Sequence, residues 1–359
     1  MQNVRATMAG NGTETLDNVF IQARTRVEHA LHAVFNERSE LPLYGMLRYF
    51  MGYTDELSRP CDVAAGKRIR ASLLLLAADM CGGGQSAEEL AVAVELFHNF
   101  TLIHDDIEDN DEMRRGRPTL WKLWGVNHAI NAGDAQVLIT SDVLLRAAAI
   151  DQGGIAGAAE LNKRFLEVIE GQYLDFELTE KALTDPAVTI DAYLEMIRKK
   201  TSVLVGAATA AGGLAAGCDA TTRDLLFAYG ESLGMAYQIA DDMASVWGDE
   251  GDTGKRAQGD LFERKKTYPV LYARDHGVRD DFIQTYLAHS PLSDTEVEEL
   301  VVAITATGAQ DATRTLGELY VVRAKGAVAL LPIASDAKHV LTQLVDTLVR
   351  FSPDNHAVD

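Results

Sequence analysis

The stretch "AEELAVAVELFHNFTLIHDDIED", residues 87–109, decides the class of fold expected for this chain. Its apolar residues recur every three or four positions, which is the period of an α-helix with a buried face. The same period recurs in other long stretches, and alternating β-branched runs flanked by turn signals are nearly absent. The sequence therefore predicts an all-α protein with about ten or more helices.

The length and composition of the chain favour one large helical bundle. The 359 residues are 47% hydrophobic, which is enough for a sizeable buried core. The breaks between helical stretches are short and no sequence repeat is visible, so we expect a single bundle around a central cavity. We place this all-α domain at residues 19–352, after a disordered lead-in at 1–18 and before a tail at 353–359.

Charge and cysteine content narrow the class of protein. The formal net charge of −20 argues against a nucleic-acid partner, because phosphate binding needs a basic face. The three cysteines are odd in number, widely spaced and without a CxxC pair, so the sequence supports neither a disulfide framework nor a zinc site and suits a reducing cytoplasm. The N-terminus lacks the apolar core of a signal peptide. The longest uncharged run, residues 201–218, predicts a closely packed buried helix and no membrane span.

A dense acidic cluster follows the apolar part of the opening stretch. Five acidic residues fall within seven positions, from Asp105 to Asp111. On a helix that continues from residues 87–103, Asp105 and Asp109 project from one face. Their carboxylates repel one another and have no counter-ion in the cluster, so we expect a bound cation to compensate the charge.

An acidic cluster of this kind can also be a calcium-binding EF-hand loop or a solvated helix end. An EF-hand is excluded, because Arg114 stands where the calcium loop needs glycine and Leu120 stands where it needs glutamate. A solvated acidic helix end is the alternative that this segment alone leaves open.

The chain repeats the acidic pattern once. The apolar helical stretch at residues 225–243 carries adjacent aspartates near its end, Asp241 and Asp242. Magnesium prefers oxygen ligands and is typically bound through one or two carboxylates together with substrate phosphates. Two aspartate clusters on facing helices would therefore suit a diphosphate bridged by several magnesium ions.

The order of motifs along residues 60–275 resembles that of the trans-isoprenyl diphosphate synthases of the polyprenyl synthetase family. The matching motifs are "GKRIR" (66–70), "LFHN" (96–99), "DDIED" (105–109), "RRGRPT" (114–119), "KT" (200–201), "YQIADD" (237–242), "GDEGDTGK" (248–255) and "KKTYP" (265–269). The resemblance implies the isoprenoid synthase type I fold, a homodimer and a magnesium-dependent prenyltransferase. Such an enzyme joins isopentenyl diphosphate to dimethylallyl, geranyl or farnesyl diphosphate.

The resemblance also implies a role for each matching residue. Three Mg²⁺ ions would be held by the two aspartate clusters, Asp105, Asp106, Asp109, Asp241 and Asp242. The allylic diphosphate would be bound by Arg114, Lys200, Thr201, Gln238, Lys255 and Lys265. Isopentenyl diphosphate would be bound by Lys67, Arg70, His98 and Arg115. The residues expected to act in catalysis are Asp105, Asp109, Asp241 and Lys200.

The second cluster departs from the family pattern and raises a rival hypothesis. Ser245 stands where a third aspartate is common, so Asp241, Ser245 and Asp249 have the spacing of the metal triad of class I terpene cyclases. Gly248 indicates that the helix ends before Asp249, and a cyclase needs no second set of diphosphate-binding cations. Prenyl transfer is therefore favoured. An inactive regulatory subunit is disfavoured because both aspartate clusters are present.

Two phenylalanines are candidates for setting product length. Phe100 lies five residues before Asp105, and Phe97 lies three residues before Phe100, so both rings can share one helix face. Both could be ordinary core residues. An aromatic residue at this position resembles family members that stop at C20, so we predict geranylgeranyl diphosphate as product, with farnesyl diphosphate (C15) as the alternative.

Overall fold

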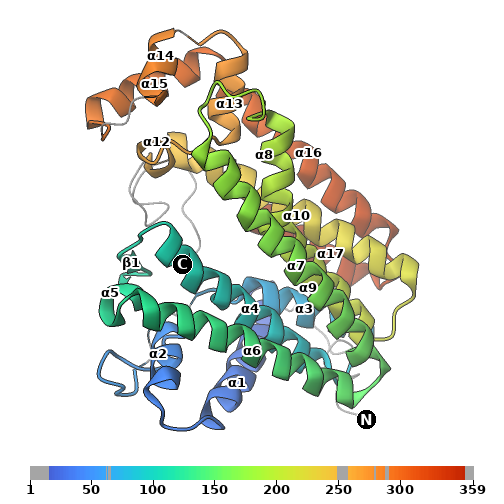
Figure 1. The fold of residues 1–359 in the computed structure, drawn as a ribbon. Helices are drawn as coiled ribbons and strands as arrows, with labels where there is room; N and C mark the ends of the chain where they lie inside the picture. Colours follow the sequence, from blue (N-terminus) through green and yellow to red (C-terminus); the bar gives the residue numbers. More distant parts are fainter. Residues whose placement is uncertain are drawn as a thin grey trace.

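The computed structural model describes residues 16–61, 63, 66–248, 258–278, 280–287 and 291–351. Most of these residues lie in α-helices (Figure 1). The described part of the chain contains one antiparallel pair of short strands, β1 (Met113–Arg114) and β2 (Arg117–Pro118). The prediction of an all-α protein is confirmed.

The helices follow one another with short connections. The first half of the chain forms α1 (Leu16–Asn36), α2 (Pro42–Phe50), α3 (Ile69–Met80), α4 (Ala87–Glu108), α5 (Leu120–Trp124), α6 (Val126–Ile150) and α7 (Gln152–Glu180). The second half forms α8 (Ile190–Ile197), the π-helix η1 (Arg198–Ser202), α9 (Val203–Ala215), α10 (Ala220–Trp247), α12 (Gly259–Phe262), α13 (Tyr268–Asp275), α14 (Asp280–Leu287), α15 (Asp294–Ala306), α16 (Ala309–Leu330) and α17 (Ser335–Leu348). Helix α1 begins three residues before the expected start of the domain.

Side-chain caps fix the starts of the two longest helices. Asp151 accepts a hydrogen bond from the backbone N–H of Gly154 at 2.6 Å and so begins α7. Asp219 accepts one from the backbone N–H of Thr222 at 2.8 Å and begins α10. A carboxylate at this position satisfies an otherwise unpaired N–H and interacts favourably with the helix dipole.

Helix α9 lies at the centre of the bundle, where it packs against α3, α7 and α10 (Figure 1). All of its residues except Leu214 are buried. Glycines allow this close packing, since a Cβ atom added to Gly212 would lie 2.2 Å from the carbonyl oxygen of Leu74 on α3. The prediction that residues 201–218 contain a buried helix is confirmed. Among the described residues, no helix is both long and apolar enough to span a bilayer.

Two hydrophobic clusters stabilise the two ends of the molecule. The larger cluster contains residues of α1, α2, α3, α4, α6 and α9. It also contains parts of α7, α10, α16 and α17. The smaller cluster contains residues of α8, α13, α14 and α15 and of the end of α10. Helix α10 contributes to both, with Leu233 in the first and Ile239 in the second. The rigid core therefore positions the ends of α4 and α10, which carry the two aspartate clusters.

We predict that Gly212→Ala lowers the free energy of unfolding by about 2–4 kcal/mol, because the added methyl group forces α9 away from α3. Urea unfolding followed by circular dichroism measures the change. Gly326→Ala on α16 is the matched control, because an added Cβ there meets nothing within 4 Å. This control should gain about 0.5–1 kcal/mol through helix propensity. Equal stability of the two variants would contradict the packing argument.

Candidate active site

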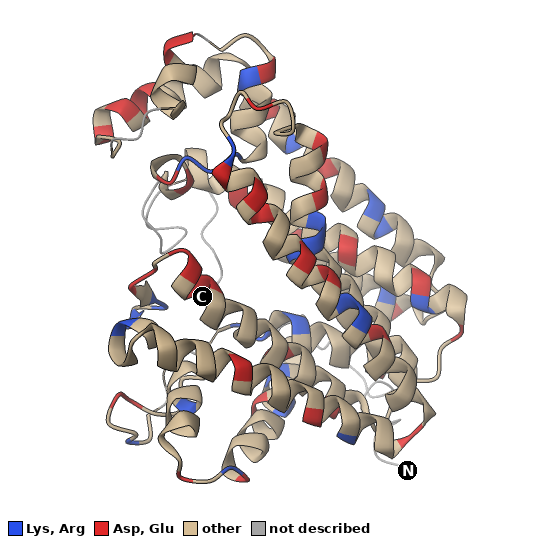
Figure 2. Cartoon of the chain, viewed as in Figure 1, with Lys and Arg blue, Asp and Glu red and all other residues tan. Residues whose placement is uncertain are grey.

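The C-terminal end of α4 carries the first aspartate cluster (Figure 2). Asp105 is partly buried, Asp106 is buried, and Asp109 is the exposed C-cap residue. The last turn of α4 contains no basic residue. Because the C-terminal end of a helix carries partial negative charge, carboxylates here are unfavourable in the absence of a compensating cation.

Burial changes the protonation of these carboxyl groups. Loss of hydration raises the pKa of Asp105 to about 6, although the ammonium group of Lys200 opposes this. Burial also raises the pKa of Asp106 to about 6, against the opposing charge of Arg114. Asp105 Oδ1 and Asp106 Oδ2 are buried and have no hydrogen-bond partner among the described residues. Such oxygen atoms are costly to bury unless a further group binds them.

Arg114 returns to the acidic cluster through a tight hairpin. The two loop residues, Arg115 and Gly116, both have positive φ, at 51° and 72°, as in a type I′ turn. The Nε of Arg114 then donates a hydrogen bond to Asp106 Oδ1. The protein itself therefore supplies a counter-ion for Asp106, a residue outside the Asp105–Asp109 pair for which none was expected. The sequence pattern did not show this ion pair because it did not show the chain reversal.

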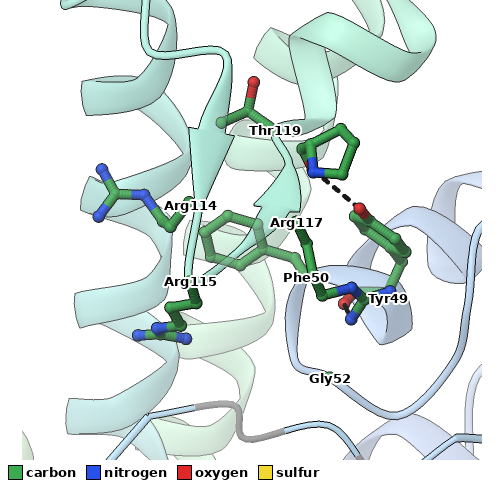
Figure 3. Close-up of a pocket in the computed structure, with 8 residues that line it drawn as sticks. Tyr49, Phe50, Gly52, Arg114, Arg115, Arg117 and Thr119 are labelled. Carbon is green, nitrogen blue, oxygen red and sulfur yellow. Dashed lines mark hydrogen bonds between the residues drawn. The ribbon is translucent and has the colours of Figure 1, made fainter. Parts of the chain in front are cut away.

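Arg117 ties this hairpin to α2. Its guanidinium donates to the carbonyl oxygens of Tyr49 at 3.0 Å and Thr54 at 2.8 Å, and lies 3.7 Å from the centre of the Tyr49 ring. Figure 3 shows Arg117 beside Tyr49, whereas Arg114 and Arg115 extend to the other side of the hairpin. The hairpin and α2 line a pocket that contains these arginines. Arg117 therefore has a structural role.

The second aspartate cluster lies near the end of α10. Asp242 is buried, which raises its pKa well above the usual value, whereas Asp241 is exposed. Asp242 accepts hydrogen bonds from the Tyr193 hydroxyl and, at 3.1 Å, from Gln238 Nε2. Thr201 Oγ1 in turn donates to Gln238 Oε1 at 3.1 Å. Both oxygens of Asp242 are thus engaged within the protein, and Asp241 is the member of the pair that faces solvent.

Lys200 lies in the π-helix η1 next to α7. Its ammonium group is 2.6 Å from Asp175 Oδ2 on α7. Burial lowers the pKa of Lys200, but the charges of Asp175 and Asp105 outweigh this effect and the net pKa is raised. Gly171 lets the backbone of η1 approach α7 closely, since a Cβ atom there would lie 2.2 Å from the backbone nitrogen of Lys200. Lys200 is therefore charged at neutral pH.

Sequence reasoning missed two α7 residues at this site, Asp175 and Gln172. Gln172 donates from Nε2 to Glu108 Oε2 at 2.9 Å, next to the first aspartate cluster. Both residues lie in "GQYLD", residues 171–175, where the period of apolar residues indicates a helix and no site. Gly171 and Asp175 are spaced i, i+4 on the helix face that carries the buried Val168 and Leu178, so a polar residue on an apolar face was the available signal for Asp175.

The residues expected to bind isopentenyl diphosphate come from three elements. Arg70, at the start of α3, places Nη1 3.2 Å from His98 Nε2 on α4. The hairpin residue Arg115 lies against Gly66, where a Cβ atom would be 2.9 Å from its Nη2. Lys67 is exposed between these contacts. The structure thus brings the loop before α3, the middle of α4 and the hairpin together.

The electrostatics of this group keep His98 neutral. Burial and the nearby guanidinium groups of Arg70 and Arg115 hold the pKa of His98 well below its usual value. Burial, with the neighbouring Arg68, also lowers the pKa of Arg115 to about 10. A surplus of positive charge in a partly buried site favours an anionic ligand.

The remaining predicted residues lie after α10 or outside the described residues. Lys265 is 2.8 Å from Glu263 Oε2, and its pKa is raised by acidic neighbours that include Asp260. Lys255 and Asp249 lie outside the described residues. Helix α10 ends at Trp247, as Gly248 indicated, and Ser245 donates its hydroxyl to the Asp242 carbonyl oxygen at 2.8 Å.

The two candidate length-setting rings are in contact. The Phe97 and Phe100 ring centres are 5.6 Å apart, which confirms that they share a helix face. Phe97 is buried and stacks on Phe165 of α7 with a ring separation of 3.8 Å. Phe100 is partly buried and contacts His104. Phe165 was not anticipated from the sequence, since it lies far along the chain.

Comparison with known proteins identifies the family. The family model described as Polyprenyl synthetase matches residues 54–304. A geranylgeranyl diphosphate synthase of Mycobacterium tuberculosis is 35% identical over 330 residues, or 90% of this chain and 91% of that protein. A farnesyl diphosphate synthase of Mycobacterium bovis is 40% identical over 233 residues, which is 65% of this chain and only 63% of that relative.

The solved structures agree with the sequence comparison. The polyprenyl synthetase of Streptomyces coelicolor has a TM-score of 0.86 and 30% identity, covering 94% of this chain and 100% of that one. The shared all-α fold confirms the predicted fold class, and the matched region contains both aspartate clusters. The chain therefore belongs to the polyprenyl synthetase family.

Proposed function

We propose that this chain is a magnesium-dependent trans-prenyltransferase that joins an allylic diphosphate to isopentenyl diphosphate, head to tail. The observation that carries the proposal is the pair of buried carboxylate oxygens on Asp105 and Asp106 that have no hydrogen-bond partner among the described residues. They lie beside cationic side chains, those of Lys200 and Arg114, that suit a diphosphate.

The aspartates fit magnesium by the chemistry of their donors. Unpartnered carboxylate oxygens are the hard ligands that Mg²⁺ prefers. Within the described part of the chain, no three acidic, His or Cys side chains are grouped so that they could hold a metal ion by themselves. The proposed ligands of three Mg²⁺ ions are Asp105, Asp106, Asp109, Asp241 and Asp242. Bound magnesium would stabilise the negative charge that develops on the departing pyrophosphate.

The protein's own cations support the departure of pyrophosphate. Lys200 stays protonated because Asp175 lies 2.6 Å away, so it can hold an anionic oxygen near Asp105 throughout the reaction. Arg114 is held in place by Asp106 and keeps further N–H donors for phosphate. Lys265, Lys255 and the Thr201–Gln238 pair complete the proposed allylic diphosphate site.

A second diphosphate is assigned to the group formed by Lys67, Arg70, His98 and Arg115. Neutral His98 can donate one ring N–H to phosphate without adding charge next to the arginines. Two cationic groups on different elements suit a reaction between two diphosphates, whereas a terpene cyclase binds one. Helix α10 ends at Trp247, and Asp249, the third residue of the cyclase-like spacing, lies outside the described residues.

We further propose geranylgeranyl diphosphate as the product, with farnesyl diphosphate as the alternative. The names of the two mycobacterial relatives support both chain lengths. The test is chromatography of products from the purified chain with Mg²⁺, isopentenyl diphosphate and each allylic primer. A C20 product supports the proposal, a cyclic hydrocarbon from one diphosphate supports the cyclase, and no turnover without a second protein supports a regulatory subunit.

We propose that the enzyme is located in the cytoplasm. We also propose that residues 19–352 form one domain and that the protein has no nucleic-acid partner. Cys61, Cys81 and Cys218 form no disulfide, in keeping with a reducing compartment.

We predict that Asp105→Asn lowers turnover by about a hundredfold or more, because it removes a charged ligand from the proposed metal site. The same change should stabilise the metal-free protein by about 1–2 kcal/mol at pH 8. The sign follows from the raised pKa of Asp105, about 6. Between the usual pKa of an aspartate and about 6, Asp105 is protonated in the folded protein but ionised in the unfolded chain. The free energy of unfolding therefore falls as the pH rises through this range.

Urea unfolding without metal, at pH 5 and at pH 8, measures this effect, and the gain from Asp105→Asn should shrink at the lower pH. Ser245→Ala is the control, because its hydroxyl only donates to a carbonyl oxygen of its own helix. It should retain most activity and show no such pH dependence. Near-normal turnover in a folded Asp105→Asn enzyme would contradict the metal assignment.

We predict that Phe100→Ala shifts the products toward longer chains, because removal of the ring opens space beneath the first aspartate cluster. The lost packing should cost about 2–3 kcal/mol of stability, as Phe100 is only partly buried. Chromatography measures product length. Phe282→Ala, in the smaller hydrophobic cluster, is the control that should lose stability without a change in products. An unchanged product distribution in active Phe100→Ala enzyme would place the limit on chain length elsewhere.

We propose a homodimer that buries parts of α6 and α7. These neighbouring helices expose large apolar side chains at helical spacing, among them Leu138, Leu145 and Leu166. Large exposed apolar patches mark interaction surfaces. Light scattering should give a mass twice the 39.0 kDa of one chain. Leu138→Glu with Leu145→Glu should give monomers, whereas Val322→Glu on α16, equally exposed, should not. A wild-type monomer would overturn the proposal.

A further inference from the structure

Arg68 is buried although it lies between two residues proposed to bind isopentenyl diphosphate. Its side chain is 0% exposed, whereas Lys67 is exposed and Arg70 is partly buried. A phosphate group therefore cannot reach Arg68 in this structure. Its effect on the site has to pass through other protein groups.

The guanidinium of Arg68 joins three elements. Its Nε lies 2.7 Å from Glu28 Oε1 on α1, and its Nη1 lies 2.8 Å from Glu95 Oε1 on α4. Its Nη2 donates to the carbonyl oxygen of Met51, just after α2, at 3.4 Å. The rigid fork of an arginine suits such simultaneous bonding, which a lysine cannot reproduce.

The backbone at this point depends on those contacts. Arg68 precedes α3 with a left-handed conformation, φ 51°, which is unfavourable for a residue with a side chain. Gly66, two residues earlier, has φ 110° and lies against Arg115. Conformations of this kind persist where surrounding contacts determine them, and the buried ion pairs of Arg68 are such contacts.

Glu95 connects Arg68 to His98, the residue that faces Arg70. Glu95 and His98 are spaced i, i+3 on α4 and so lie on the same side of that helix. Asn99 donates to Glu95 Oε1 at 2.9 Å and fixes its carboxylate. Arg70, two residues after Arg68, reaches His98 at 3.2 Å. The Arg68–Glu95 pair therefore sets the distance between the start of α3 and the part of α4 that carries His98.

We propose that Arg68 and Glu95 form a positioning pair for the isopentenyl diphosphate site, which hold Lys67, Arg70 and His98 in the geometry that binds this substrate. The inference rests on the proposed assignment of those three residues to isopentenyl diphosphate. Lys67 and Arg70 would touch the substrate, whereas the buried Arg68 would hold them in position without touching it.

The test compares steady-state kinetics of Arg68→Lys and Glu95→Gln with those of the wild-type enzyme. Each variant should raise the KM for isopentenyl diphosphate about tenfold, while the KM for the allylic diphosphate and kcat stay within about twofold to threefold. Thermal unfolding of each variant is measured in parallel. Arg164→Gln on α7 is the control, because it also loses two ion pairs, to Glu160 at 2.7 Å and Glu167 at 3.0 Å.

The control should lower thermal stability without separating the two KM values. Arg70→Gln tests the assignment itself, and an unchanged KM for isopentenyl diphosphate in that variant would overturn the proposed site. If Arg70→Gln raises this KM but Arg68→Lys and Glu95→Gln do not, the positioning role is wrong. If the KM values for isopentenyl diphosphate and for the allylic diphosphate rise together while stability falls, Arg68 and Glu95 have only a structural role. If Arg68→Lys does not fold, the near-isosteric Glu95→Gln decides the question.

Discussion

Burial of carboxylates at the ends of two helices is the constraint on which the rest of the site depends. Asp106 and Asp242 have lost nearly all contact with water, and Asp105 retains little. Ionised carboxylates in such surroundings are unfavourable unless cations or hydrogen-bond donors compensate them. The protein supplies part of this compensation through Arg114 and Lys200. Two carboxylate oxygens of the first cluster, on Asp105 and Asp106, have no hydrogen-bond partner among the described residues and suit the proposed metal and diphosphate.

The surrounding elements follow from this requirement. The hairpin after α4 returns Arg114 to the helix end, and the π-helix η1 brings Lys200 next to α7. The loop before α3 places Arg70 against His98, and the buried Arg68 fixes that loop to α1 and α4. Two cationic groups are thereby held on separate elements, an arrangement that suits the proposed reaction between two diphosphates.

The helices and most charged residues of the site could be predicted from the sequence, because apolar period and motif order are local patterns. The pairings could not, because they join residues far apart in the chain. Asp175 meets Lys200 only because Gly171 lets η1 approach, and Phe165 meets Phe97 only because α7 packs on α4. Motif spacing likewise identified the second aspartate cluster, but not that Asp242 is already engaged by neighbouring donors.

The most direct test of the central claim is calorimetric titration of pyrophosphate into the purified chain, with and without Mg²⁺. If the unsatisfied carboxylate oxygens are reserved for metal and diphosphate, pyrophosphate should bind at least about a hundredfold more tightly with Mg²⁺, since the acidic cluster otherwise repels it. Equal affinity in the presence and absence of the metal would contradict the account, because the cationic side chains alone would then suffice to hold the diphosphate.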